Sequence, residues 1–111
     1  MTVTLPTGSA DARLLTAGAD ILTPGPQTWV VLKATVNNTD SVAHKLTAWR
    51  VAAGSTSGAS VPMLYALSIP AGETDALPIS GQAFGANQAF HVTATATGVL
   101  NISVSYAIVS T

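Results

Sequence analysis

Apolar and polar residues alternate along most of the chain, and the alternating stretches are separated by residues that form turns. Alternation with a period of two is the pattern of a β-strand that buries one face. No stretch carries a sustained stripe with the 3.6-residue period of a helix, so we expect no helix. The pattern predicts strands over residues 28–36, 44–53, 63–69, 76–79, 90–96 and 99–109.

The alternation also predicts which side chains share a face. Successive side chains of a strand point to opposite sides of the sheet, so every second residue lies on one face. In the strand over residues 28–36, one such face consists of Val30, Leu32, Ala34 and Val36. In the strand over residues 63–69, the apolar face consists of Met63, Tyr65, Leu67 and Ile69.

The last two predicted strands have apolar faces that would match in one hairpin. These faces are Phe90, Val92 and Ala94 on the first strand and Leu100, Ile102 and Val104 on the second. A three-residue loop over residues 96–98 would pair Thr95 with Val99 and place both faces on the same side of one sheet. That loop would also put Gly98 at the left-handed position of a type I turn with a following bulge. The pattern therefore predicts a hairpin in this register.

Residues 1–27 differ from the rest because turn signals dominate them and only two short apolar pieces occur, Leu14-Leu15 and Ile21-Leu22. We interpret this segment as an extended N-terminal arm with one or two short edge strands. Residues 28–111 would then form the β-sandwich domain. The expected fold is all-β, an antiparallel β-sandwich or jelly roll of about seven to eight short strands. We also expect deletion of residues 1–22 to leave a folded domain.

Charge is scarce. Charged side chains make up 8% of the 111 residues, whereas a typical soluble protein has about 25%. A surface so poor in charge gives little protection against self-association, and charge is depleted where subunits meet. We therefore expect a homo-oligomer in which much of the surface is covered by other subunits. The alternative is a neutral surface covered in serine and threonine.

Several classes of partner and location are disfavoured. Four scattered basic residues do not form the basic cluster that nucleic-acid binding requires. The apolar runs are too short to span a membrane, and the N-terminus lacks the features of a signal peptide. We expect no nucleic-acid partner, no membrane partner and synthesis in a cytoplasm.

Two polar clusters have the residue types of hydrolytic enzymes. Asp40, Ser41 and His44 could supply a triad, but triads are assembled across a fold, so we interpret them as a hydrated turn. Glu73 and Asp75 lie on one short segment, whereas the two carboxylates of a glycosidase face each other across a sugar. Neither cluster predicts catalysis.

His91 lies on the polar face of its predicted strand and has no second histidine nearby in the sequence with which to hold a metal. We expect a structural or interface role for it, with a pH-sensitive contact as the alternative. The chain has no cysteine, phosphate-binding loop or dinucleotide fingerprint. We therefore expect no enzyme activity, no cofactor and no metal.

The C-terminal part resembles small virion proteins of tailed bacteriophages from about Thr28 to Val109. Its features are a strand that ends in an Asn/Thr/Asp turn, an apolar strand that runs into Pro-Ala-Gly-Glu, an Ala/Thr alternation and a closing strand. These segments read ATVNNTD, LSIPAGETDALPI, FGANQAF, HVTATATG and VLNISVSYAIV. The resemblance implies a β-sandwich that coats or extends a phage particle as a symmetric oligomer, and it carries no catalytic residues.

The resemblance implies a non-enzymatic virion protein, most specifically a capsid decoration (cement) protein that stabilises the head by bridging subunits. Its partners would be the major capsid protein or other virion subunits. The alternative is a head, neck or tail fibre, or a receptor- or carbohydrate-recognition module that binds a glycan. The candidate contact residues are Arg13, Leu14, Leu15, Ile21, Leu22, Trp49, Tyr65, Glu73 and Asp75, together with the loop 54–58.

Overall fold

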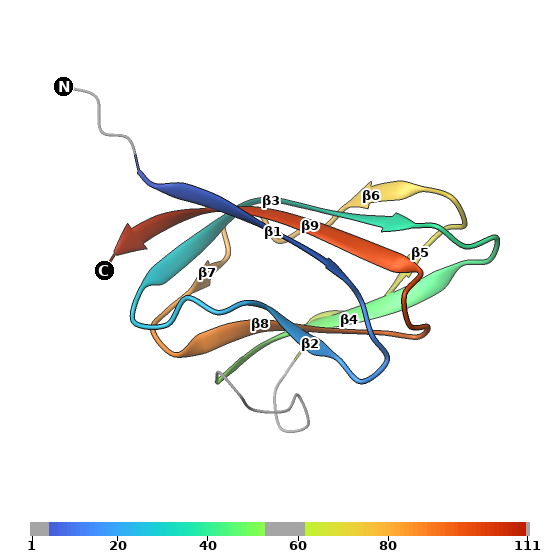
Figure 1. The fold of residues 1–111 in the computed structure, drawn as a ribbon, viewed down its shortest axis with the longest axis horizontal. Helices are drawn as coiled ribbons and strands as arrows, with labels where there is room; N and C mark the ends of the chain where they lie inside the picture. Colours follow the sequence, from blue (N-terminus) through green and yellow to red (C-terminus); the bar gives the residue numbers. More distant parts are fainter. Residues whose placement is uncertain (1–4, 53–61, 111) are drawn as a thin grey trace.

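The computed structural model describes residues 5–52 and 62–110, and the described part contains nine β-strands and no helix (Figure 1). The strands form two antiparallel sheets, which we call sheet A and sheet B. In spatial order, sheet A contains β1 (Thr7–Arg13), β9 (Leu100–Ser110), β3 (Thr28–Asn38) and β6 (Thr74–Ala76), and β7 (Ala83–Phe84) also pairs with β3. Sheet B contains β2 (Ala19–Leu22), β8 (Gln88–Ala94), β4 (His44–Ala52) and β5 (Pro62–Ile69).

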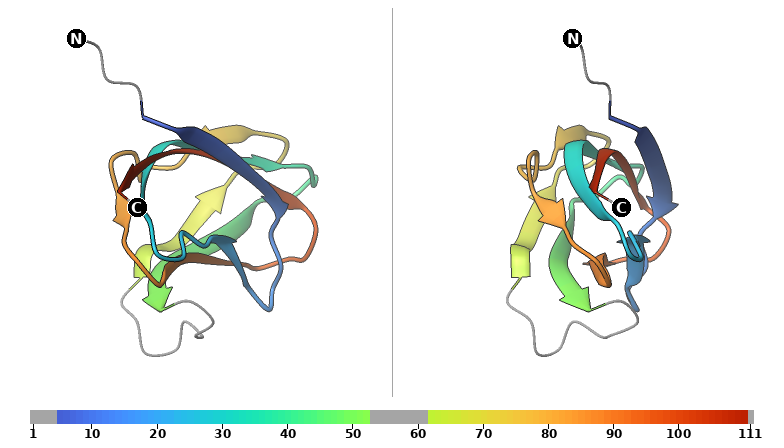
Figure 2. Two further views of the ribbon diagram at one scale, coloured as in Figure 1. Left: turned by 60° about the vertical axis from the view of Figure 1, so that its left-hand side comes forward. Right: turned by 90° about the vertical axis from the view of Figure 1, so that its left-hand side faces the viewer.

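The two sheets pack face to face, and the core lies between them (Figure 2). Burial alternates along the long strands, as the period of two predicted. Two phenylalanine rings, Phe84 from β7 and Phe90 from β8, meet at 5.4 Å between centroids and are fully buried. The expected fold class, an antiparallel β-sandwich, is confirmed.

Most predicted strands lie close to observed ones, but the region around residues 74–84 differs. β6 spans Thr74–Ala76, earlier than the predicted strand over residues 76–79. Leu77 and Ile79 follow it outside any strand and are nevertheless buried in the core. The two-residue β7 was not predicted, because so short a strand leaves no periodic signal.

The predicted C-terminal hairpin is wrong. β8 pairs with β2 and β4 in sheet B, whereas β9 pairs with β1 and β3 in sheet A. The loop between them therefore crosses from one sheet to the other. The apolar faces of β8 and β9 are buried as expected, but they face each other across the core. Gly98 does adopt a positive φ of 83° in that loop.

Two β-bulges change which side chains face outward. In β3 the register against β9 shifts between Val31 and Lys33, so Val31 points into the core and Leu32 is 50% exposed. In β5 the register against β4 shifts near Ala66, which has a φ of 49°. Tyr65 is consequently 80% exposed. Leu32 therefore does not share a face with Ala34 and Val36, and Tyr65 does not share one with Ile69, as the alternation predicted. The predicted faces are wrong at these two positions, because an extra residue in one strand inverts the alternation beyond it.

The N-terminal segment is integrated into the sandwich. β1 lies at one edge of sheet A beside β9, and β2 lies at one edge of sheet B beside β8. Leu14 and Leu22 are fully buried in the core. Residues 7–22 thus supply an edge strand to each sheet and part of the core, so we no longer expect the domain to fold without them.

Candidate interaction surfaces

The sequence-derived contact residues near the N-terminus divide between surface and core. Arg13, at the end of β1, is exposed, and Leu15 is 38% exposed. Ile21 is half-buried and packs against the core. Leu14 and Leu22 are fully buried, so their side chains do not reach a partner in this conformation.

The remaining candidates lie on different strands. Tyr65 projects from the bulge of the edge strand β5. Trp49, on β4, is half-buried and lies beside His91, with ring centroids 6.0 Å apart. Glu73 is exposed and Asp75 is half-buried, at the start and in the middle of the β6 region. The loop 54–58 lies outside the described residues.

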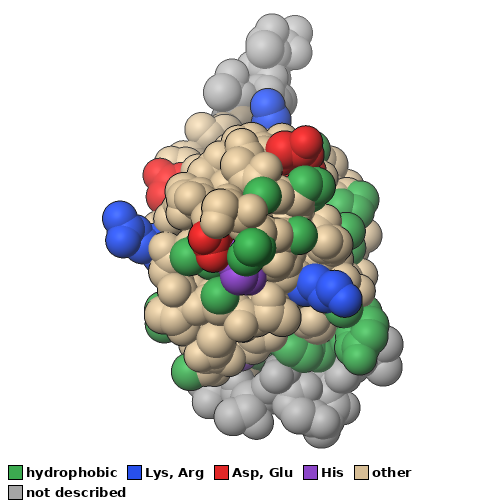
Figure 3. Space-filling model, turned by 90° about the vertical axis from the view of Figure 1, so that its right-hand side faces the viewer, with side chains coloured by type: hydrophobic (Ala, Val, Ile, Leu, Met, Phe, Trp, Pro, Cys, Tyr) green, Lys and Arg blue, Asp and Glu red, His purple; other side chains and the backbone are tan. Residues whose placement is uncertain are grey.

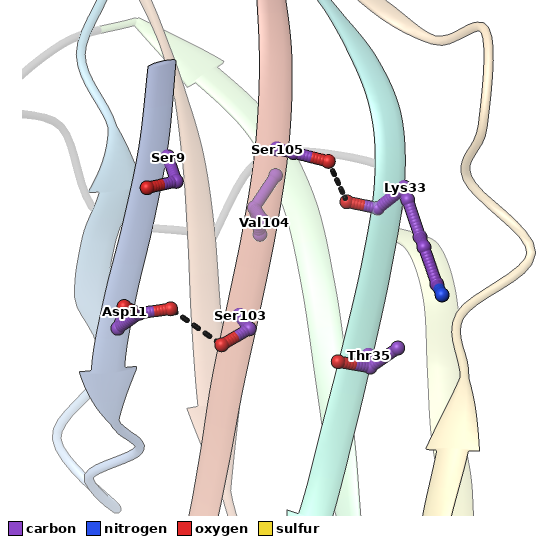
Figure 4. A pocket seen from close by; sticks show the side chains of 7 residues that line it. All are labelled: Ser9, Asp11, Lys33, Thr35, Ser103, Val104 and Ser105. Carbon is purple, nitrogen blue, oxygen red and sulfur yellow. Dashed lines mark hydrogen bonds between the residues drawn. The ribbon is translucent and has the colours of Figure 1, made fainter.

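The outer face of sheet A carries a shallow hollow lined mostly by polar residues, none of which is among the sequence-derived contact residues (Figure 4). Its volume is about 280 Å³. The strand register places Ser9, Ser105 and Lys33 in one row across β1, β9 and β3. The next row contains Asp11, Ser103 and Thr35. Polar alternation in each strand could have indicated these residues, but only the strand order brings them together.

One hydrogen bond crosses this hollow and ties β1 to β9. The hydroxyl of Ser103 donates to the Asp11 carboxylate, as Figure 4 shows. The hydroxyl of Ser105 donates to the backbone carbonyl of Lys33 at 3.4 Å. The hollow therefore offers hydroxyl groups, one carboxylate and one ammonium group on an open face.

On the outer side of sheet B, His91 and Asp20 form a hydrogen-bonded pair. His91 Nδ1 and Asp20 Oδ1 lie 2.8 Å apart and join β8 to β2. Gly18 lies directly over the imidazole, since a Cβ atom there would come within 2.5 Å of His91 Nε2. The observed contacts give His91 a structural role in holding β2.

Asp40 is the centre of the polar turn between β3 and β4. Its carboxylate accepts the backbone N–H of Ser41 at 2.7 Å and lies 2.7 Å from His44 Nε2. The hydrogen bond from His44 is the largest cause that lowers the pKa of Asp40 below its ordinary value of 3.8. A triad needs the histidine between serine and aspartate, whereas here the aspartate lies between the other two. These contacts stabilise the turn between β3 and β4.

The described residues contain no group of three or more histidine, aspartate or glutamate side chains placed to hold a metal ion. Among the same residues, no helix is long and apolar enough to span a membrane. Both histidines are instead engaged by one aspartate each.

Charged side chains are sparse and well separated on the surface, as Figure 3 shows for one end of the molecule. Several of them also have partners within the chain. Arg50 donates to Gln82 at 3.1 Å and to the carbonyl of Ala83 at 3.0 Å, and its guanidinium lies 5.1 Å from the Phe84 ring centroid. These contacts hold the Arg50 side chain in place and leave its charge unchanged.

No protein-family model matches the chain, and no curated protein matches it in sequence. Among solved structures, the chain is similar to a capsid asymmetric unit of cyanophage Pam1, with a TM-score of 0.37 and 15% identity. The likeness covers 95% of this chain and 85% of the other. A likeness with so low a TM-score and identity carries no argument about function.

Proposed function

We propose that the chain is a non-enzymatic structural protein of a bacteriophage particle, and specifically a decoration protein that stabilises the head by bridging subunits. The supporting observation is a β-sandwich with few charged side chains, nine in the whole chain of 111 residues. Its partners would be further copies of itself and the major capsid protein or other virion subunits.

The chain has nine charged residues. Asp20 and Asp40 are paired with histidines, Asp11 accepts a hydrogen bond from Ser103, and Arg50 is held by the 82–83 segment. The remaining surface is rich in serine, threonine, asparagine and alanine. Such a surface loses little hydration energy when a neighbour covers it, because few charges must be desolvated.

Decoration also fits the size of the molecule. A stable contact buries about 1,600 Å² in total, and the accessible surface of the chain is 5832 Å². Several contacts repeated around a symmetric shell act together, so each can be individually weak. A small neutral sandwich is suited to that arrangement.

A fibre or recognition module is the second candidate, and Tyr65 is the observation that favours it. Its ring is 80% exposed on an edge strand without any charged residue. Exposed tyrosine is enriched where proteins contact partners, and an aromatic face can also cover a sugar ring. Under this proposal the chain would bind a glycan or receptor from a head, neck or tail fibre.

The test is mass spectrometry of density-gradient-purified phage particles from the source of the sequence. We expect peptides of this chain in the particle fractions, in copy numbers comparable to the shell protein. Only a few copies per particle, found with isolated tails or necks, would support the fibre alternative. Absence of the chain from every particle fraction would overturn the virion role.

A further inference from the structure

We propose that the outer edge of β1 pairs antiparallel, through residues 11–13, with the same residues of a second copy of the chain, so that sheet A of one copy continues into sheet A of the other. The inference does not depend on the virion role. It follows from the backbone pattern of β1, from its side chains and from the arrangement of its charges.

The outer edge of β1 has no partner among the described strands, because β1 is terminal in sheet A. Its ladder with β9 is regular over all seven residues. The other edge strands differ: β2, β6 and β7 have four residues or fewer, and β5 is interrupted by the bulge at Ala66. A long, regular, unpaired edge is a template for pairing with another chain.

The hydrogen-bond pattern shows which groups are available on that edge. Leu14 N–H donates to the Leu100 carbonyl at 2.8 Å, and Ile108 N–H donates to the Pro6 carbonyl at 2.8 Å. Antiparallel ladders use alternate residues, so the even-numbered residues of β1 bond to β9. The N–H and C=O groups of Thr7, Ser9, Asp11 and Arg13 consequently point away from β9.

The side chains of β1 leave room for a neighbouring strand. The residues that alternate with these four are Gly8, Ala10 and Ala12, and they face the core side. They are too small to obstruct an approaching backbone. The four outward residues are exposed, and none of them is a proline or a lysine, two devices that commonly protect an edge.

The charges select a second copy as the occupant and also select its register. A two-fold axis at Ala12 places Asp11 opposite Arg13 of the second copy, and the symmetric pair forms as well. Because β1 ends at Arg13, this register pairs residues 11–13 of the two strands. An axis at Asp11 would place two aspartates opposite each other, which is unfavourable. An axis at Ala10 would overlap all seven residues of β1 but would make no charge pair. The first register is therefore the one we propose.

Charge reversal tests the register. We expect Asp11→Arg and Arg13→Asp each to raise the dimer dissociation constant by about tenfold or more, because both pairs become repulsive. The double variant D11R/R13D should return it to within about threefold, because both pairs are restored in swapped form. Sedimentation equilibrium over a wide range of concentrations measures these constants.

A proline variant tests the backbone pairing separately. Asp11→Pro removes an outward N–H and keeps the β9 ladder, whereas Asp11→Ala removes only the side chain. We expect the dimer dissociation constant of the proline variant to be about tenfold higher than that of the alanine variant. The near-ultraviolet circular dichroism of Trp29, whose ring centroid lies 4.1 Å from that of Tyr106, verifies that each variant is folded.

A wild-type chain that stays monomeric at every concentration would overturn the inference. So would a dimer that is unaffected by the single reversals, or one that the double reversal does not restore. The particle experiment above can fail or succeed independently of all three results.

Discussion

At the scale of single residues, Asn38 holds together the turn that connects the two sheets. Its side chain is fully buried. Its Nδ2 donates to the carbonyls of Val42 and Ile69, each at 2.9 Å, and its Oδ1 accepts the N–H of Asp40 at 2.9 Å. A buried amide with all these partners replaces hydrogen bonds that the backbone would otherwise make with water.

We expect Asn38→Ala to lower the free energy of unfolding by about 2 to 4 kcal/mol, because it leaves buried carbonyl and N–H groups without partners. The control is Asn37→Ala, which removes one exposed hydrogen bond to Thr74 and should cost less than about 1 kcal/mol. Urea denaturation measures both values. Equal losses for the two variants would contradict the role assigned to Asn38.

At the scale of elements, a close contact at Gly18 fixes how β2 lies against β8. Gly18 has a φ of 85°, and its α-carbon faces the imidazole of His91 and the methyl group of Thr93. The same imidazole bonds to Asp20 in β2. The short connection from β1 to β2 therefore needs a residue without a Cβ atom at position 18, which only glycine provides.

Gly18→Ala tests this contact, and Gly25→Ala is the matched control. Gly25 also has a positive φ, of 67°, but no atom lies within 4 Å of the position of its Cβ. We expect Gly25→Ala to cost about 1 kcal/mol from backbone strain alone. Gly18→Ala should cost about 1 to 3 kcal/mol more, because the His91 ring must move.

Thermal or urea unfolding measures the loss of stability in Gly18→Ala and in Gly25→Ala. The NMR chemical shifts of the imidazole protons report on the His91–Asp20 pair. We expect these shifts to change in Gly18→Ala and to stay unchanged in Gly25→Ala. A Gly18 variant with the same stability and the same imidazole shifts as the control would show that the contact is unimportant.

At the scale of the whole molecule, the N-terminal segment belongs to the folding unit. β1 completes one edge of sheet A, and β2 completes one edge of sheet B. The two fully buried leucines of the segment, Leu14 and Leu22, each contribute about 1.5 to 3 kcal/mol through burial. A domain is stable by only about 5 to 15 kcal/mol in total.

We therefore expect deletion of residues 1–22 to abolish cooperative unfolding, because it removes two strands and part of the core. Deletion of residues 1–4, which precede the described strands, is the control and should retain a cooperative transition. Circular dichroism during thermal unfolding distinguishes the two. Cooperative unfolding of the longer deletion would restore the interpretation of this segment as a separate arm.

The candidate surfaces could be predicted from the sequence only in part. The polar alternation of β1 and of β9 is visible in the chain, and so is the exposure of Glu73. The hollow on sheet A depends on Asp11, Ser103 and Thr35 lying in one row, and this requires the order β1-β9-β3. Likewise, the partner of His91 is 71 residues away in the sequence, and local patterns contain no information about such pairs.

The all-β class, the positions of the long strands and most of the core faces follow from the local pattern of residues, because the period of two is a local property of an extended backbone. Which sheet each strand joins depends on contacts between residues far apart in the chain. A hairpin and a crossing between sheets would bury the same faces of β8 and β9, so the apolar pattern could not distinguish them. The bulges that expose Leu32 and Tyr65 also depend on strand pairing. A bulge is an extra residue in one strand relative to the neighbouring strand, so it cannot be recognised from one strand alone.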